Sequence, residues 1–192
     1  GAIGPRGDGY KSGVMSADEA QAYHAAQIAV FARTAADMVC AFTMTSVPEA
    51  VGVARAARAA DMPCAISFTV ETDGRLPSGP TLREAVEAVD AQTDAAPAYY
   101  MVNCAHPTHF AGALEPGARW MDRLRGVRAN ASRKSHAELD ESTSLDAGDA
   151  AELGREYRAL RRRFPQLRVL GGCCGTDHRH LAAICEAVME PA

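Results

Sequence analysis

Two adjacent cysteines near the end of the chain are the residues whose type and spacing point most directly to chemistry. Cys173 and Cys174 lie within the sequence GGCCGT of residues 171–176. The flanking glycines allow the backbone dihedral angles at which two neighbouring side chains can face one point. Thr176 or Asp177 can cap a following helix, and the positive end of its dipole is expected to lower the pKa of the nearby thiols. The motif therefore favours thiolates that can bind a metal ion.

A third cysteine would complete a catalytic metal site. Zinc normally takes four ligands, and a catalytic site keeps one position for water or substrate. Cys104 ends a predicted strand, so it could join Cys173 and Cys174 as a third sulfur ligand and leave one open place. The alternative is a tight glycine turn that happens to hold two small residues, because there is no C-x-x-C motif and spacing does not bring Cys104 close. The residues by themselves leave both interpretations open.

The remaining cysteines are expected to be packing residues. The chain has six cysteines, which could form a disulfide framework. Because no basic and apolar leader opens the sequence, reduced thiols or metal ligands are expected instead, and there is no sign of secretion. The expected location is therefore the cytoplasm. Cys40, Cys64 and Cys185 are interpreted as small apolar side chains, two of them in strands and one in the last helix.

Histidines close to these motifs are not expected to bind the metal. His106 and His109 follow Cys104 and are interpreted as loop residues. His178 and His180 are expected to face solvent at the start of the last helix. The thiols are thus the expected metal donors.

Composition excludes several classes of protein. The 192 residues suit one domain, and 47% hydrophobic residues are enough to bury a sizeable core. The formal net charge of -4 argues against a nucleic-acid partner, which usually leaves a strongly basic surface. The longest apolar runs are too short to cross a bilayer, so no membrane partner is expected. We therefore expect residues 1–192 to form a single domain.

Short apolar strands alternate with longer amphipathic helices along the chain. Ser16 is typical of a helix start, because Glu19 follows it in the capping-box position. Alternation at this spacing predicts a parallel sheet with helical crossovers. The expected strands are Ala2–Gly4, Asp37–Thr43, Pro63–Val70, Ala98–Cys104, Gly126–Asn130 and Leu167–Gly171. The expected helices are Ser16–Ala35, Val47–Ala60, Thr81–Gln92, Ala147–Arg163 and Asp177–Met189.

An open doubly wound sheet and a (β/α)8 barrel both fit this alternation. A G-x-G-x-x-G phosphate loop would favour the open sheet, and none follows a predicted strand. Polar and thiol residues instead follow the carboxyl ends of several strands, which is typical of the barrel. These residues are Thr69–Glu71, Asn103–Cys104, Asn130 and Cys173–Cys174. The expected fold class is therefore α/β, a (β/α)8 TIM-type barrel of which this chain holds strands 3 to 8 only.

Four segments together resemble the homocysteine S-methyltransferase family. They are GAIGP at residues 1–5, SFTVETDGRLPSGPTL at residues 67–82, the strand-end Asn103-Cys104 and GGCCGT at residues 171–176. The resemblance runs in order along nearly the whole chain. It implies a (β/α)8 barrel with Zn²⁺ held by Cys104, Cys173 and Cys174. It also implies that the first two strands of the family, with their Asp-Gly motif and part of the substrate pocket, are not in this chain.

One departure from the family pattern concerns the substrate. In many relatives the fourth strand ends in Glu-Thr, and that Glu helps to hold the amino group of the substrate. The aligned pair in this chain is Phe42-Thr43. Either this subgroup holds the amino acid differently, through Glu71, or its substrate differs; Glu71 as a solvated loop carboxylate is the alternative. Asn130 matches an Asn of the family pattern and is the second candidate for substrate binding.

The implied function is zinc-dependent methyl transfer. A free alkyl thiol has a pKa above neutrality, so it is a poor nucleophile until zinc binding removes its proton. The resemblance implies transfer of a methyl group from an onium donor, S-methylmethionine or S-adenosylmethionine, to homocysteine, as a step of methionine biosynthesis. The expected partners are a small-molecule thiol and a methyl donor, and the oligomeric state is left open. The alternative is a redox or metal-sensing zinc-thiolate protein, or a barrel that has lost catalysis.

Overall fold

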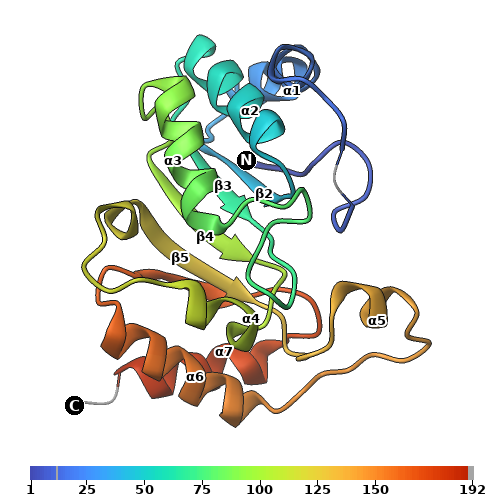
Figure 1. Cartoon of the computed structure of the whole chain (residues 1–192), viewed down its shortest axis with the longest axis vertical. Coiled ribbons are helices and arrows are strands. Elements are labelled where there is room, and N and C mark those ends of the chain that lie inside the picture. The colour runs from blue at the N-terminus through green and yellow to red at the C-terminus, as the bar shows by residue number, and fades with distance from the viewer. Residues whose placement is uncertain (12, 190–192) are drawn as a thin grey trace. The chain divides into compact units, whose positions relative to one another are not determined.

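Parallel strands alternate with helices from one end of the chain to the other (Figure 1). The structure is a computed structural model, and it describes residues 1–11 and 13–189. It divides into two compact units. Unit 1 comprises Gly1–Thr69 and Arg75–Met101, and unit 2 comprises Val70–Gly74 and Val102–Ala192. None of the helices in the described part of the chain is long and apolar enough to cross a membrane.

Unit 1 is built from parallel strands with helices between them. Its hydrogen-bonded strand order is β1-β2-β3-β4, with Ala2 opposite Cys40 and Val39 opposite Cys64. Val39, Ile66 and other strand residues are fully buried, so these strands form the core of the unit. The strands are β1 (Ala2–Ile3), β2 (Val39–Met44), β3 (Cys64–Phe68) and the first part of β4 (Tyr99–Asn103). The helices are α1 (Ala17–Phe31), α2 (Val47–Ala59) and α3 (Leu82–Thr93).

Local signals explain where the helices of unit 1 begin and how they pack. The Ser16 hydroxyl accepts a hydrogen bond from the Glu19 amide, and the Glu19 carboxylate accepts one from the Ser16 amide. This is the expected capping box, and it satisfies amide groups that the first turn of a helix leaves unpaired. Helices α1 and α2 approach closely at Gly52, where an added Cβ would lie 2.6 Å from the Gln21 nitrogen. Glycine at this position therefore allows the two helices to pack.

A buried polar pair lies between these two helices. The His24 Nε2 atom is 3.0 Å from Glu49 Oε1, and both side chains are only 1% exposed. Glu49 Oε1 also accepts a hydrogen bond from the Arg6 amide. The pair thus connects α1, α2 and the loop that follows β1.

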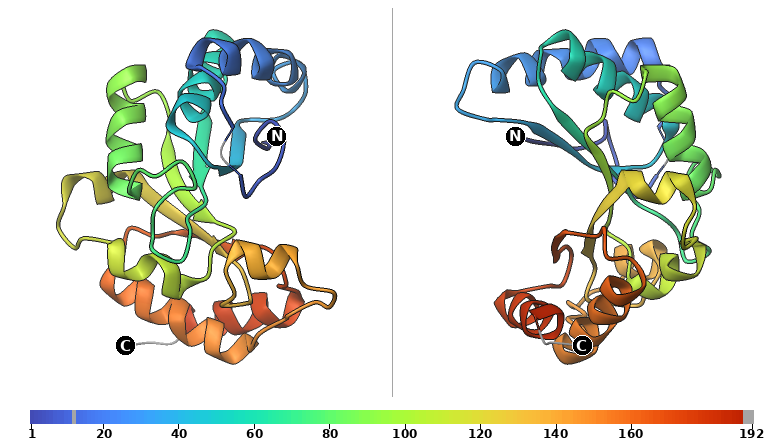
Figure 2. Two further views of the ribbon diagram at one scale, coloured as in Figure 1. Left: turned by 45° about the vertical axis from the view of Figure 1, so that its right-hand side comes forward. Right: turned by 90° about the vertical axis from the view of Figure 1, so that its left-hand side faces the viewer.

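Unit 2 continues the same pattern. Its strand order is β4-β5-β6, and β5 pairs with β6 in parallel from Gly126 opposite Val169 to Ala129 opposite Gly172. Helices α6 and α7 lie side by side, as both views in Figure 2 show. Besides the end of β4, the strands are β5 (Leu124–Ala129) and β6 (Val169–Gly172). The helices are α4 (Pro107–Phe110), η1 (Ala111–Ala113), η2 (Arg119–Arg123), α5 (His136–Asp140), α6 (Ala150–Arg163) and α7 (His178–Met189).

The elements expected from the sequence are present, with ends that differ by a few residues. Each of the six expected strands overlaps an observed strand, and each of the five expected helices overlaps an observed helix. The short helices α4 and α5 and the two 3-10 helices were not expected. They span too few residues to produce a periodic apolar pattern, so sequence periodicity cannot reveal them.

Candidate metal centre

Three cysteine side chains of unit 2 lie together at the ends of two strands. Cys104 directly follows β4, and Cys173 and Cys174 directly follow β6. The Cys104 sulfur is 2.7 Å from the Cys173 sulfur and 3.7 Å from the Cys174 sulfur. All three sulfur atoms lie within 4.8 Å of one another. The structure therefore supplies the proximity of Cys104 that spacing in the sequence could not establish, and the group can hold a metal ion.

The donor set fits a zinc-sized ion. Zn–S bonds of about 2.3 Å in a tetrahedral arrangement place two sulfur ligands about 3.8 Å apart. The Cys104–Cys174 separation of 3.7 Å already has this length, whereas the Cys104–Cys173 pair at 2.7 Å would open by about 1 Å. Cys104 is buried, Cys173 is half-buried and Cys174 is exposed. The group is thus closed on the Cys104 side and accessible to a further ligand on the Cys174 side.

The thiols hold their protons more strongly than expected. The hydrogen bond with Cys173, then that with Cys174, and then burial raise the pKa of Cys104 well above its ordinary value. The Cys104 hydrogen bond lowers the pKa of Cys173, but Cys174 and burial outweigh it and the net shift is upward. The expected lowering by a helix dipole was wrong for Cys173, because neighbouring thiols and burial dominate its surroundings. A bound dication would reverse this effect, since it favours deprotonated sulfur ligands.

The backbone at Cys104 adopts an uncommon conformation. Its φ is +54°, in the left-handed region that non-glycine residues rarely occupy. Such a conformation costs about 1–3 kcal/mol and persists only where surrounding contacts hold it. Its carbonyl oxygen accepts hydrogen bonds from Asn130 Nδ2 at 3.0 Å and from His136 Nε2 at 2.7 Å. These two donors hold the strand end that carries the thiol.

Asn130 forms hydrogen bonds with the backbone of both Cys104 and Cys174. Its Nδ2 donates to the Cys104 carbonyl, and its Oδ1 accepts a hydrogen bond from the Cys174 amide at 3.2 Å. The side chain is only 2% exposed. Asn130 directly follows β5, the strand between β4 and β6. The residue considered for substrate binding therefore bonds the backbone of two of the three cysteines.

His136 and Glu71 form a polar pair beside Cys104. The His136 Nδ1 atom is 3.2 Å from Glu71 Oε1, while Nε2 faces the Cys104 carbonyl. His136 is 5% exposed, whereas the Glu71 side chain is 37% exposed. The sequence suggested Glu71 but not His136. The capping box of Ser135 and Glu138 marks the start of α5, but it carries no sign that His136 would be buried.

Tyr157 supports the strand end that leads to Cys173. This residue of α6 is fully buried. Its hydroxyl accepts a hydrogen bond from the Ala129 amide at 2.8 Å and donates one to the Gly171 carbonyl at 2.6 Å. Burial raises the pKa of Tyr157, so the hydroxyl keeps the proton that it donates. A tyrosine 14 positions before Gly171 in the sequence gives no local sign of this role.

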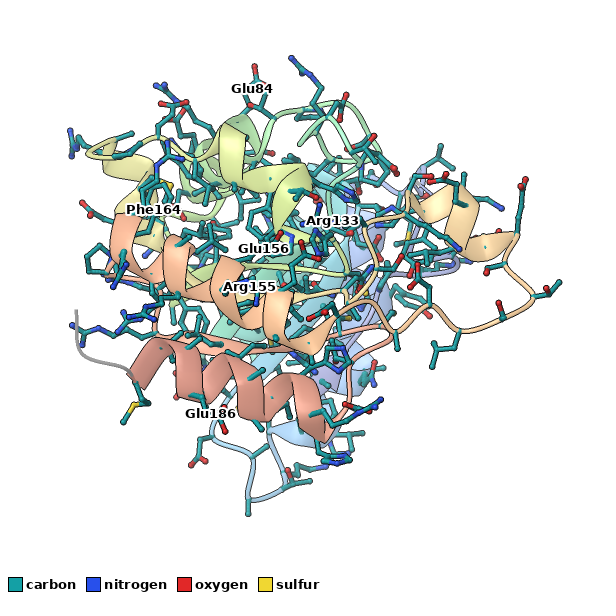
Figure 3. All side chains as sticks on the ribbon, turned by 90° about the horizontal axis from the view of Figure 1, so that it is seen from below. Glu84, Arg133, Arg155, Glu156, Phe164 and Glu186 are labelled. Atoms are coloured by element: carbon teal, nitrogen blue, oxygen red, sulfur yellow. The ribbon has the colours of Figure 1, made fainter. Side chains whose placement is uncertain are left out.

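A second polar network is formed around His106, two residues after Cys104 in the sequence. His106 lies in the loop before α4, as expected, but it is only 2% exposed, and its Nε2 lies 3.3 Å from Glu156 Oε2. Burial, then Arg133 and His109, lowers the pKa of His106 to about 4. Arg133 pairs with Glu156 at 2.9 Å, and Figure 3 shows the two side chains next to each other. His109 Nε2 lies 2.9 Å from the Arg133 carbonyl. These histidines thus bond protein groups outside the thiol group.

Two expectations for the last helix were wrong. His180 is buried, with Nε2 2.7 Å from the Ala147 carbonyl and Nδ1 2.9 Å from Asp177 Oδ1. Cys185, expected as a packing residue, is exposed. Helix α7 lies against α6, and its buried residues are His180 and Ile184. Cys64 is buried as expected, and Cys40 is half-buried.

The residues that replace the Glu-Thr of the family pattern lie in unit 1. Phe42 is half-buried near the end of β2. Thr43 has a φ of +59°, and the pairing of β2 with β3 shifts between Ala41 and Met44. The strand end at Phe42 is therefore irregular.

Comparisons with known proteins give a family and a fold for the chain. A family model described as homocysteine S-methyltransferase matches residues 1–188. The oxidized form of the homocysteine methyltransferase MmuM from Escherichia coli is similar, with 20% sequence identity and a TM-score of 0.69. The match covers 94% of this chain and 56% of that one. A search among curated proteins found no match.

Two further crystal structures of the same Escherichia coli protein are similar. The metallated form has 18% identity and a TM-score of 0.65, and the match covers 95% of this chain and 58% of that chain. The apo form has 20% identity and a TM-score of 0.64, and the match covers 97% of this chain and 60% of that chain. The chain thus spans less than two thirds of these proteins. The likeness confirms the expected fold class, α/β with part of a TIM-type barrel.

Proposed function

Because the chain belongs to the homocysteine S-methyltransferase family, we propose that it carries the zinc site and part of the substrate pocket of an enzyme that methylates homocysteine to methionine. The convergence of the Cys104, Cys173 and Cys174 sulfur atoms within 4.8 Å, with one side accessible, is the observation that supports this best. S-Methylmethionine and S-adenosylmethionine are the proposed methyl donors. We also propose that residues 1–192 form a single domain with strands 3 to 8 of the barrel.

Zinc, when bound, supplies a Lewis acid that lowers the pKa of the substrate thiol and keeps the sulfur nucleophilic at neutral pH. Cys104, Cys173 and Cys174 would hold the ion as thiolates, and a catalytic zinc site with three protein ligands keeps one position for the substrate thiol. Cys104 lies on the buried side and Cys174 on the exposed side. The substrate would therefore approach from the side of Cys174.

The chemical step is a displacement at carbon. The homocysteine sulfur attacks the methyl carbon of the sulfonium donor, and the bond between that carbon and the donor sulfur breaks. Its electron pair stays on the donor sulfur, which becomes a neutral thioether, and the thiol proton passes to solvent. The task of the protein is to align the two sulfur atoms with the methyl group between them.

Glu71 is the proposed acceptor for the α-ammonium group of homocysteine. Phe42 stands where many relatives place the glutamate with this role, so another carboxylate has to replace it. Glu71 is 37% exposed, and its link through His136 to the Cys104 carbonyl places it in the neighbourhood of the thiol group. Asn130 is proposed to support the pocket by fixing the backbone at Cys104 and Cys174.

Two measurements test the proposal. Metal analysis of protein purified without chelator is expected to give about one zinc per chain, and Cys173→Ala is expected to remove most of it. The exposed Cys185 provides the matched control, since Cys185→Ala changes a cysteine outside the thiol group. Undiminished zinc in Cys173→Ala would exclude these ligands.

Activity is measured by mass spectrometry of methionine, with each donor and homocysteine supplied to a protein that also carries the preceding strand–helix units. Cys104→Ala is expected to abolish turnover, and Cys185→Ala is expected to leave it intact. If a zinc-loaded enzyme forms no methionine from either donor, homocysteine is not its substrate.

A redox or metal-sensing role is the second candidate. The observation that favours it is the 2.7 Å separation of the Cys104 and Cys173 sulfur atoms. Reversible oxidation of these thiols in a protein that transfers no methyl group would support this role. Zinc binding without turnover would instead support a barrel that has lost catalysis.

A further inference from the structure

The left-handed backbone of Cys104 requires an explanation in the surrounding contacts. With a φ of +54°, the residue directs its side chain toward Cys173 and Cys174 instead of continuing β4. A non-glycine residue leaves this region unless neighbouring groups hold it there. The carbonyl group of Cys104 is where two such groups make contact, through Asn130 and His136.

Of the two donors, His136 makes the shorter contact and is itself held in place. Its Nε2 is 2.7 Å from the Cys104 oxygen, against 3.0 Å for Asn130 Nδ2. Because carbonyl and carboxylate oxygens only accept hydrogen bonds, Nε2 donates to the Cys104 oxygen, and Nδ1 has to carry a proton as well for its contact with Glu71 to be a hydrogen bond. Nδ1 faces the Glu71 carboxylate at 3.2 Å, which fixes the plane of the ring. The preceding capping box, in which Ser135 and Glu138 bond each other, fixes the backbone at His136.

We propose that His136 is a positioning residue of the metal centre: its Nε2 hydrogen bond to the Cys104 carbonyl holds Cys104 in the conformation that turns its thiol toward Cys173 and Cys174. Glu71 orients the imidazole ring from the other side. The inference rests on the proposed function only in assuming that the three thiols bind a metal ion. His136 is not itself a ligand, and it acts through the backbone of Cys104.

The two nitrogen atoms of the His136 ring have different partners, and substitutions can separate their contributions. The amide nitrogen of glutamine reaches about as far as Nε2, so His136→Gln can retain the bond to the Cys104 carbonyl. The amide of asparagine reaches only as far as Nδ1, so His136→Asn keeps a polar group near Glu71 but loses the bond to Cys104. His136→Leu loses both bonds and keeps an apolar side chain of similar bulk.

The experiment measures cobalt(II) binding to the purified protein and its variants. Cobalt(II) serves as a spectroscopic substitute for zinc, because its sulfur-to-metal charge-transfer band reports bound thiolates. Competition with a chelator gives the metal affinity. Loss of a group that orients a ligand typically weakens metal binding by about 10- to 100-fold, which is the decrease expected for His136→Leu and His136→Asn. His136→Gln is expected to keep most of the affinity and a normal band.

His24 in unit 1 provides a matched control. It is also a buried histidine with a carboxylate partner, Glu49 at 3.0 Å, but its pair lies between α1 and α2. His24→Leu is expected to lower thermal stability without changing the cobalt(II) affinity or spectrum. Circular dichroism of each metal-free variant checks that it is folded before the metal is added.

The possible outcomes distinguish the inference from the proposed function. Weak binding by the Leu and Asn variants with retention in the Gln variant supports a positioning role. If all three variants bind cobalt(II) as tightly as the unaltered protein, the positioning role is overturned. An equal loss of affinity in all three also overturns it, whether or not the His24 variant shares the loss. If the unaltered protein binds neither cobalt(II) nor zinc, the proposed function fails. If it binds metal and the His136 variants bind equally well, only this inference fails.

Discussion

The hydroxyl of Tyr157 joins β5 to β6, the strand that ends at Cys173 and Cys174, and the effect of removing it can be measured at one backbone amide. Tyr157 is fully buried, and its hydroxyl accepts from the Ala129 amide on β5 and donates to the Gly171 carbonyl on β6. Tyr157→Phe removes a single oxygen atom, so it leaves the aromatic packing in place. The change isolates the two hydrogen bonds.

The expected loss of stability follows from the groups left behind. A buried donor or acceptor that loses its partner costs about 1–3 kcal/mol. Two such groups remain in Tyr157→Phe, so the free energy of unfolding is expected to fall by about 2–6 kcal/mol. For a chain of this length the melting temperature should then fall by roughly 4–24 °C. Metal affinity should fall as well, because Gly171 lies two residues before Cys173.

Urea denaturation and amide hydrogen exchange test the expectation. The free energy of unfolding comes from denaturation, and the exchange rate of the Ala129 amide reports the bond that the hydroxyl accepts. Tyr100→Phe is the control, because it removes a tyrosine hydroxyl that donates to Asp90 at 2.7 Å in unit 1. It should also lower stability but leave the Ala129 amide protected. If Tyr157→Phe changes neither stability nor Ala129 exchange, the hydroxyl does not join these strands.

Four further expectations can be tested together. Gly175→Ala should destabilise the protein by about 1–2 kcal/mol in denaturation, because φ is +78° there and a Cβ would lie 2.8 Å from the Asp146 carbonyl; unchanged stability would contradict it. Glu71→Gln should raise KM for homocysteine about 10- to 100-fold with little change in kcat, and an unchanged KM would leave Glu71 as a solvated loop carboxylate. Because the pKa values of Cys104 and Cys173 are raised, zinc binding at neutral pH should release protons, which a weakly buffered indicator solution detects, and the affinity for zinc should fall as pH falls. Binding without proton release would show that the thiols are not the ligands. Since β1 and β6 end the strand order of the described residues, the purified chain should associate with rising concentration in sedimentation, and a stable monomer would refute this.

The helices, the strands and the residue types of the site could be predicted from local sequence signals. The capping box at Ser16 and the apolar strand segments act within a few residues of chain, so they are visible without the fold. The GGCCGT motif of residues 171–176 can likewise be recognised without the fold, because two thiols stand between glycines. These local signals, together with the resemblance of whole segments, were sufficient to predict the fold class and the family.

Which residues come into contact could not be predicted from the sequence and follows from the fold. Cys104 and Cys173 are 69 positions apart, and their contact depends on parallel strands that end at the same edge. His136, buried against the Cys104 carbonyl, and Tyr157, between β5 and β6, carry no local sign of these contacts. The expectations for His180 and Cys185 were wrong for the same reason: whether a side chain is buried depends on the element that packs against it. Signals in the sequence act over a few residues, whereas the register of the strands and the return of the chain bring together groups that are tens of residues apart.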